Sequence, residues 1–302
     1  MNKVARSPTP LFAAAAGMSV ANVYYAQPLL DAVARDFAIP QAAIGAIVGA
    51  TQLGCVLALL FVVPLGDLLE RRRLMLAQAL LLAAILAAVG IVNSAPLLLA
   101  AMLLTGLFGT AMTQGLIAYA ASSAAEHERG RVVGATQGGV FVGLLLARVV
   151  AGGIGDVAGW RGVYLCSAGA MLLLAALLWR RLPMLAPTSG AAIRYPALLA
   201  SLFDLLRRHR VLQVRGVLAL LMFAAFNVFW SALVLPLSAA PYGFSHTAIG
   251  AFGLVGAVGA LAAAGAGRWS DRGHGERVSA AALVALLIAW WPLSMLEQSL
   301  AA

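Results

Sequence analysis

The sequence predicts an all-α membrane protein, built as a bundle of transmembrane helices. Of its 302 residues, 63% are hydrophobic and only 10% are charged, whereas a soluble domain carries about 25% charged residues. So few charges cannot cover a surface that faces water. The apolar residues also fall into runs close to the roughly 20 residues that a helix needs to cross a bilayer. Composition and run length therefore indicate the same class.

Nine apolar runs are long enough to be membrane spans, and charged or turn-forming residues separate them. The first run follows Lys3 and Arg6 as in a signal peptide, but it is longer than the apolar core of a leader, which predicts an uncleaved span. The spans are expected at 11–33, 41–65, 74–93, 96–121, 132–156, 161–180, 214–237, 246–267 and 278–296.

The basic residues predict a cytoplasmic amino terminus. With that orientation, seventeen of the 20 Lys and Arg residues lie inside, and two, Arg35 and Arg161, lie in outer loops. This bias follows the positive-inside rule and predicts a multi-pass protein of the cell inner membrane with a periplasmic carboxyl terminus. Because the basic residues cluster in short breaks between apolar runs, the lipid bilayer and not nucleic acid is the expected partner.

Three parts are expected along the chain. Residues 1–182 would form a six-helix transmembrane bundle, and 214–302 would form an incomplete second bundle of about three spans. Between them, 183–213 is hydrophilic and is read as a cytoplasmic linker. Its amphipathic segment at 198–212 ends in basic residues, which predicts a helix lying on the inner leaflet.

Two stretches of the chain repeat at one offset. Residues 22–25, Asn-Val-Tyr-Tyr, are echoed 205 positions later by 227–230, Asn-Val-Phe-Trp, and Gly45 is echoed by Gly250 at the same offset. A parallel duplication of a six-helix unit would account for both matches. The second unit would then lack three helices, so the chain is expected to be truncated after its ninth span.

Two loops carry partial copies of the pattern Gly-x-x-x-Asp-Arg-x-Gly-Arg-Arg. The loop at 63–73 keeps its acid and trailing arginines, and 267–277 keeps its Gly, Asp and Arg. This pattern resembles the best-known motif of the major facilitator superfamily. Residues 21–30 and the Gly-Trp-Arg at 159–161 are similar to bacterial drug and metabolite efflux permeases. The resemblance implies a monomeric secondary transporter, without a cofactor, that exports small organic molecules by alternating access.

Polar residues near the middle of the spans predict a substrate cavity. Arg148 lies deep within a span, where a charge is costly. It is expected to bind an anionic group or to pair with an acid, and Asp31 is the candidate partner. The alternatives are a side chain that reaches the outer headgroups and, for the uncharged residues, hydrogen bonds between helices. The candidate cavity residues are Asn22, Tyr25, Gln52, Arg148, Asn227 and Trp230.

Charged residues at the cytoplasmic ends of helices are candidate gating contacts. The family resemblance implies that such loops hold one state of the transporter, whereas the alternative gives the arginines only an anchoring role. By the same resemblance, small-residue faces would let span 5 pack closely on span 8. The candidate gating residues are Asp67, Arg71, Arg72, Asp271 and Arg272.

The sequence contains no catalytic or metal-binding pattern, so the chain is not expected to be an enzyme. It has neither a His-Glu-x-x-His motif nor paired cysteines, and its one lysine, Lys3, cannot complete a phosphate-binding loop. Transport energy would have to come from a gradient, and protons are one candidate coupling ion. The leading hypothesis is efflux of small organic molecules, and the alternative is a truncated, transport-inactive remnant.

Overall fold

The computed structural model describes residues 9–40, 43–182, 195–239, 242–254 and 274–293. Throughout these residues the regular structure is helical, with no strand, as the sequence predicts for an all-α protein. The chain divides into two units, 1–251 and 252–302, and each is described by itself.

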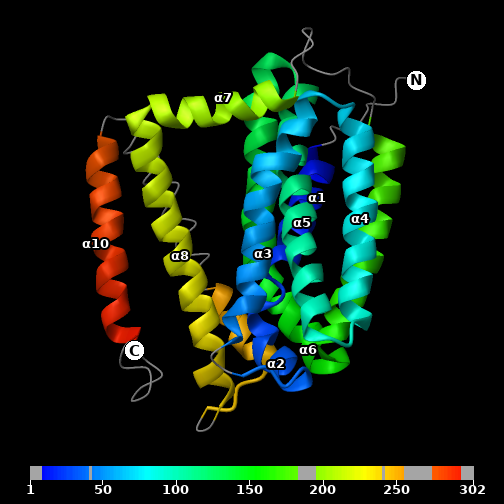
Figure 1. Ribbon diagram of the computed structural model, residues 1–302, viewed down its shortest axis with the longest axis vertical. Coiled ribbons are helices and arrows are strands. Elements are labelled where there is room, and N and C mark those ends of the chain that lie inside the picture. The colour runs from blue at the N-terminus through cyan, green and yellow to red at the C-terminus, as the bar shows by residue number, and fades with distance from the viewer. Residues whose placement is uncertain (1–8, 41–42, 183–194, 240–241, 255–273, 294–302) are drawn as a thin grey trace. The chain divides into compact units, whose positions relative to one another are not determined.

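The apolar runs of the first unit form long helices joined by short turns (Figure 1). The helices are α1 (Thr9–Tyr24), α2 (Leu30–Asp36), α3 (Gly45–Leu57), α4 (Arg71–Ile91), α5 (Ala95–Ser123), α6 (Arg129–Arg181), α7 (Tyr195–Arg208) and α8 (Arg210–Ser238). A further helix begins at His246 and is described to residue 254. The second unit contains α10 (Gly275–Leu293).

Five helical stretches among the described residues are long and apolar enough to cross a membrane. They are Gly45–Asp67, Arg71–Ile91, Ala95–Ser123, Glu126–Arg181 and Arg210–Ser238. The first of these continues α3 through a π-helical turn, Ala58–Val62, and a 3-10 turn, Val63–Asp67.

The predicted first span, 11–33, is interrupted and is not one continuous helix. α1 ends at Tyr24, a 3-10 turn covers Gln27–Leu29, and the chain resumes as α2. Pro28 lies in the first turn of that 3-10 segment, where its missing N–H is tolerated although it would break a regular helix. Gln27 therefore belongs to the 3-10 turn and not to α1.

The predicted spans at 132–156 and 161–180 form the two arms of α6, which is kinked at Gly159. That residue has φ 70° and ψ 171° inside the helical stretch, a conformation that essentially only glycine adopts. Directly after the kink, the Trp160 indole donates a hydrogen bond to Asp36 at 3.0 Å, and Arg161 forms an ion pair with the same carboxylate. The Gly-Trp-Arg segment thus ties α6 to the end of α2.

Replacing Gly159 by alanine is expected to destabilise the chain by about 1–3 kcal/mol, because a side chain disfavours this backbone conformation. Thermal unfolding of the protein in detergent measures the effect. The matched control is Gly134→Ala, since Gly134 is helical and nothing lies within 4 Å of an added Cβ. Equal unfolding temperatures for the two variants would contradict the assigned role of the kink.

The hydrophobic core of the first unit lies among α1, α4, α5 and α6, and these helices with α2 and α3 are called the first bundle. Phe12, Leu82, Tyr119 and Tyr164 are fully buried there. Gly139, in the predicted fifth span, packs on α1, where an added Cβ would lie 2.1 Å from the Ala13 carbonyl oxygen. These small residues therefore allow α6 to pack closely on α1 inside the first bundle.

α8 meets the first bundle near its carboxyl-terminal half. It contacts α2, the turn Gln27–Leu29 and α3. Its amino-terminal half stands away from α3 in Figure 1 and carries exposed apolar side chains such as Val214 and Leu221. The predicted amphipathic segment forms α7, which ends at Arg208 and not at residue 212, because the next helix already begins at Arg210.

Candidate functional site

The guanidinium of Arg148, on α6, is the charged centre of the candidate site. Arg148 is only 1% exposed. Its Nη2 donates to Gln27 Oε1 at 2.6 Å, and its Nη1 donates to the Leu144 carbonyl oxygen at 3.1 Å. The side chain points into the protein, which contradicts the alternative in which it reaches the outer headgroups.

Three amide side chains connect this arginine to α3 and α8. Gln27 Nε2 and Gln52 Nε2 donate to the same acceptor, Asn227 Oδ1, at 3.2 and 3.1 Å. Asn227 Nδ2 is held by the Phe223 carbonyl oxygen at 2.8 Å, so the amide orientation of Asn227 is fixed. Because Gln27 donates to Asn227, its oxygen is left to face Arg148.

Aromatic rings cover the guanidinium. The Arg148 Cζ atom lies 4.0 Å from the ring centroid of Trp230, 5.2 Å from that of Phe226 and 5.5 Å from that of Tyr24. The rings also contact one another, with Phe226 and Trp230 in an edge-to-face arrangement at 6.4 Å. Such rings attract a cation through their electron-rich faces. The structure brings together four of the six predicted cavity residues: Arg148, Gln52, Asn227 and Trp230.

Asn22 and Tyr25 lie on another side of the first span. Asn22 is buried, its Oδ1 accepts a hydrogen bond from Ser167 Oγ at 2.5 Å, and its Nδ2 donates to the Met18 carbonyl oxygen at 2.8 Å. These bonds give Asn22 the alternative role, a contact between α1 and α6. Tyr25 is half-buried and lines a groove between the same helices.

The predicted ion pair between Asp31 and Arg148 is not formed. The Asp31 carboxylate instead lies 3.0 Å from Arg35 Nη1 and 3.0 Å from His246 Nε2. The expectation rested on similar depth within the first and fifth spans, but the interruption at Pro28 displaces α2 from the register of α1. Within the described part of the chain, Arg148 has no carboxylate partner.

The sequence did not reveal a second cluster, which consists of Asp31, Asp156, His246 and Thr247. We call it the outer clasp, after the side of the membrane on which the positive-inside bias would place it. His246 bridges two helices, with Nε2 at 3.0 Å from Asp31 and Nδ1 at 3.0 Å from Asp156. Asp156 also accepts the backbone N–H groups of His246 and Thr247, both at 3.0 Å, and the Thr247 hydroxyl at 2.6 Å. An α6 carboxylate thus caps the helix that begins at His246.

Close backbone packing accompanies the outer clasp. An added Cβ at Gly250 would lie 2.3 Å from the Arg148 carbonyl oxygen, and one at Gly152 would lie 2.3 Å from the His246 carbonyl oxygen. Span 5 and the start of span 8 are therefore in the direct contact that the family resemblance implied. The residues that make it are Gly152 and Gly250, and not Gly139 or Gly143, which pack on α1.

The candidate gating residues of the first loop bond within the first bundle. Arg71 pairs with Asp67 at 3.1 Å and donates from Nε to the Gly66 carbonyl oxygen at 2.9 Å. Its Nη1 donates to the Ala118 carbonyl oxygen at 3.1 Å, which ties the loop to α5. Arg72 donates to the Trp179 carbonyl oxygen on α6.

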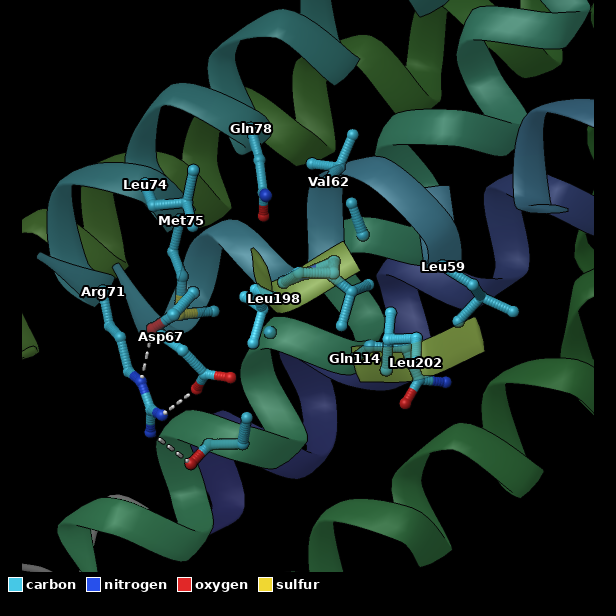
Figure 2. A pocket seen from close by; sticks show the side chains of 16 residues that line it. Leu59, Val62, Asp67, Arg71, Leu74, Met75, Gln78, Gln114, Leu198 and Leu202 are labelled. Carbon is cyan, nitrogen blue, oxygen red and sulfur yellow. Dashed lines mark hydrogen bonds and ion pairs between the residues drawn. The ribbon is translucent and has the colours of Figure 1, made fainter. Parts of the chain in front are cut away.

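A pocket of about 270 Å³ lies beside this loop. Figure 2 shows Asp67 and Arg71 on one side of it, Gln78 and Gln114 on others, and Leu198 reaching in from α7. Glu70 caps α4 by accepting the backbone N–H groups of two following residues, both at 2.9 Å. The second predicted gating pair, Asp271 and Arg272, lies outside the described residues.

Within the described residues, no group of three or more His, Cys, Asp or Glu side chains is placed to hold a metal ion. The features that remain are a bundle of apolar helices, a buried cluster of polar and aromatic groups shared by the first bundle and α8, and close helix packing beside it. Together they describe a helical membrane protein with a polar cluster in its interior. The chain belongs to the Major Facilitator Superfamily, whose family model matches residues 12–301.

Two curated relatives are similar along most of the chain. The sequence is 41% identical over 280 residues to the uncharacterized transporter YgaY of Escherichia coli O157:H7, which covers 93% of this chain and 70% of that protein. It is 34% identical over 284 residues to the probable transporter SCO4007 of Streptomyces coelicolor, with 92% and 65% covered.

Two solved structures share the fold. A bacterial homolog of the human lysosomal transporter Spinster, in an inward-facing and unoccupied conformation, aligns with a TM-score of 0.73 at 17% identity, covering 90% of this chain and 64% of that one. A D-xylose-proton symporter aligns with a TM-score of 0.52 at 17% identity, covering 83% and 65%. The chain thus spans somewhat less than two thirds of each solved transporter.

Proposed function

We propose that the chain is a secondary transporter that exports small organic molecules, drugs or metabolites, by alternating access. The observation that carries the proposal is the buried cluster in which Gln27 bonds both Arg148 and Asn227. A substrate bound there would contact α6 and α8 at once, so it would sense and stabilise their relative arrangement. The direction of transport rests on the likeness of residues 21–30 and 159–161 to efflux permeases.

The packing around the cluster supports alternating access. At one side, the outer clasp and the contact of Gly250 with Arg148 hold α6 close to the helix that follows α8. Toward its amino terminus, α8 has exposed apolar side chains. One state of an alternating transporter requires a substrate site that is closed on one side. On its other side, the site must be flanked by a helix that packs loosely enough to move. The other state would release the clasp.

Protons are the proposed coupling ion, and the outer clasp is the proposed place where they act. His246 lies between the carboxylates of Asp31 and Asp156, both at 3.0 Å. Protonation of an imidazole in this position strengthens both contacts, and loss of the proton weakens them. The proton content of the clasp would therefore be linked to closure of that side.

Export is tested by the retention of compounds in cells that lack their own drug exporters. Cells that make the chain are expected to accumulate several-fold less of at least one fluorescent or radiolabelled compound from a broad panel. A protonophore should remove the difference if protons drive export. Cells with an empty vector are the control. Equal accumulation of every compound, with the protein confirmed in the membrane, would favour the rival hypothesis of a transport-inactive chain.

The proposed location is the cell inner membrane, with a cytoplasmic amino terminus, a periplasmic carboxyl terminus and a monomeric assembly. A periplasm-active reporter is expected to be active when it follows Ala302 and silent when it follows Arg208. The positive-inside bias provides the reason, because residue 208 lies in the most basic segment. A silent reporter after Ala302, or an active one after Arg208, would contradict this topology.

A further inference from the structure

Arg148 carries a positive charge that the described protein does not balance. Removing a charge from water is costly unless an opposite charge or enough hydrogen bonds replace the lost solvation. Arg148 is 1% exposed, yet among the described residues it makes only the bonds to Gln27 and Leu144. Its Nε is buried and has no hydrogen-bond partner there. Three of the five N–H donors of the guanidinium therefore remain unused within the described part of the chain.

The ion-paired arginines of the first bundle show the contrast. Each lies beside a carboxylate, and each has a more exposed side chain than Arg148; they are Arg35, Arg71, Arg73, Arg131 and Arg161. Even Arg71, whose side chain is only 10% exposed, has a carboxylate partner in Asp67. The most deeply buried arginine instead faces an amide oxygen, a backbone carbonyl and three ring faces.

We propose that the missing counter-charge is supplied by the substrate, and that the transporter carries small organic anions with an apolar ring. The anionic group, a carboxylate or a similar acid, would bind the unused N–H donors of Arg148, starting at Nε. The rings of Trp230, Phe226 and Tyr24 would pack against the apolar part. This inference rests on the proposed transport function and names the substrate class of the same site.

The amide network gives the bound anion a mechanical consequence. Gln27 Oε1 accepts the short bond from Arg148 Nη2, and Gln27 Nε2 donates to Asn227 on α8. An anion that binds Nε and the adjacent Nη2 together would compete with Gln27 Oε1 for Nη2, because both are acceptors. Displacing Gln27 would loosen the connection between the turn at Pro28 and α8, so that anion binding is linked to movement of α8.

The test is binding of matched compounds to the full chain in lipid nanodiscs, read from the unfolding temperature. Benzoate is the anion, benzamide its neutral counterpart, benzylammonium the cation and sulfate the inorganic anion. Benzoate should raise the unfolding temperature in a saturable way, since a ligand that binds only the folded state stabilises it. The other three should not. Arg207→Gln, an exposed arginine on α7, is the control and should keep the benzoate effect.

Arg148→Gln should weaken benzoate binding at least about tenfold, and Arg148→Lys should retain part of it, because lysine keeps the charge and loses the fork of donors. If Arg148→Gln fails to fold, the lysine variant and the unmodified chain still decide the outcome. Equal stabilisation by benzamide or benzylammonium would overturn the proposal. So would equal stabilisation by sulfate, or no benzoate effect at about 10 mM, ten times a weak Kd of about 1 mM.

Failure of this inference is distinguishable from failure of the proposed function. A chain that exports a neutral or cationic compound and ignores benzoate would retain the transport function and overturn the anion class. A chain that binds benzoate through Arg148 but exports nothing would support the anion class and overturn the transport function.

Discussion

Replacing Arg148 by glutamine is expected to reduce transport by about 30-fold or more, because truncating one side of a buried, hydrogen-bonded charged contact costs about 2–5 kcal/mol. The variant removes the bond to Gln27 Oε1 and the contact with the Trp230 ring. Folding should survive, since glutamine is cheaper to bury than an arginine without a carboxylate partner. The initial rate of transport into inside-out membrane vesicles measures the effect.

The control for Arg148→Gln is Arg207→Gln, which removes the same charge from the exposed surface of α7. Both variants must be present in the membrane at the level of the unmodified protein. A transport rate of Arg148→Gln equal to that of the control would contradict the assignment of Arg148 to the substrate site.

Replacing Gly250 by leucine is expected to abolish transport while substrate binding is retained. Even a Cβ at this position would lie 2.3 Å from the Arg148 carbonyl oxygen. The two helices would have to separate, at a cost of about 1–3 kcal/mol typical of overpacking. The state with the outer clasp closed would therefore be lost, and the cycle could not be completed. Transport rate and ligand-induced stabilisation, measured on the same preparation, separate the two effects.

Gly216→Leu is the matched control, because Gly216 lies on exposed α8 surface with nothing within 4 Å of an added Cβ. It should transport at the unmodified rate. Normal transport by Gly250→Leu would show that close contact between α6 and the helix that begins at His246 is not part of the cycle.

The helical membrane fold could be predicted because it depends on patterns that are local in the sequence. Long apolar runs define the spans, and Asn227 was found because 227–230 repeats the pattern of 22–25. Burial of a charge within a span also pointed to Arg148. These properties need no knowledge of which helices are neighbours.

The partners of these residues could not be predicted, because they depend on backbone geometry and on distant parts of the chain. Gln27 contacts Arg148 from the 3-10 turn that contains Pro28, and not from a regular helix. The same interruption invalidated the expected pairing of Asp31 with Arg148. His246 and Asp156 are 90 residues apart, and neither lies in a pattern that marks the other as its partner.

The central claim is that the buried cluster around Arg148 and Asn227 opens alternately to the two sides of the membrane. Accessibility of position 227 from each side tests it most directly. Cys55 and Cys166 would be changed to serine, and Asn227 to cysteine, so that one thiol reports on the site. A membrane-impermeant maleimide would then be applied to right-side-out and to inside-out vesicles under transport conditions. Alternating access predicts labelling from both sides, at rates that a bound substrate changes. Labelling from one side alone under every condition would contradict the account.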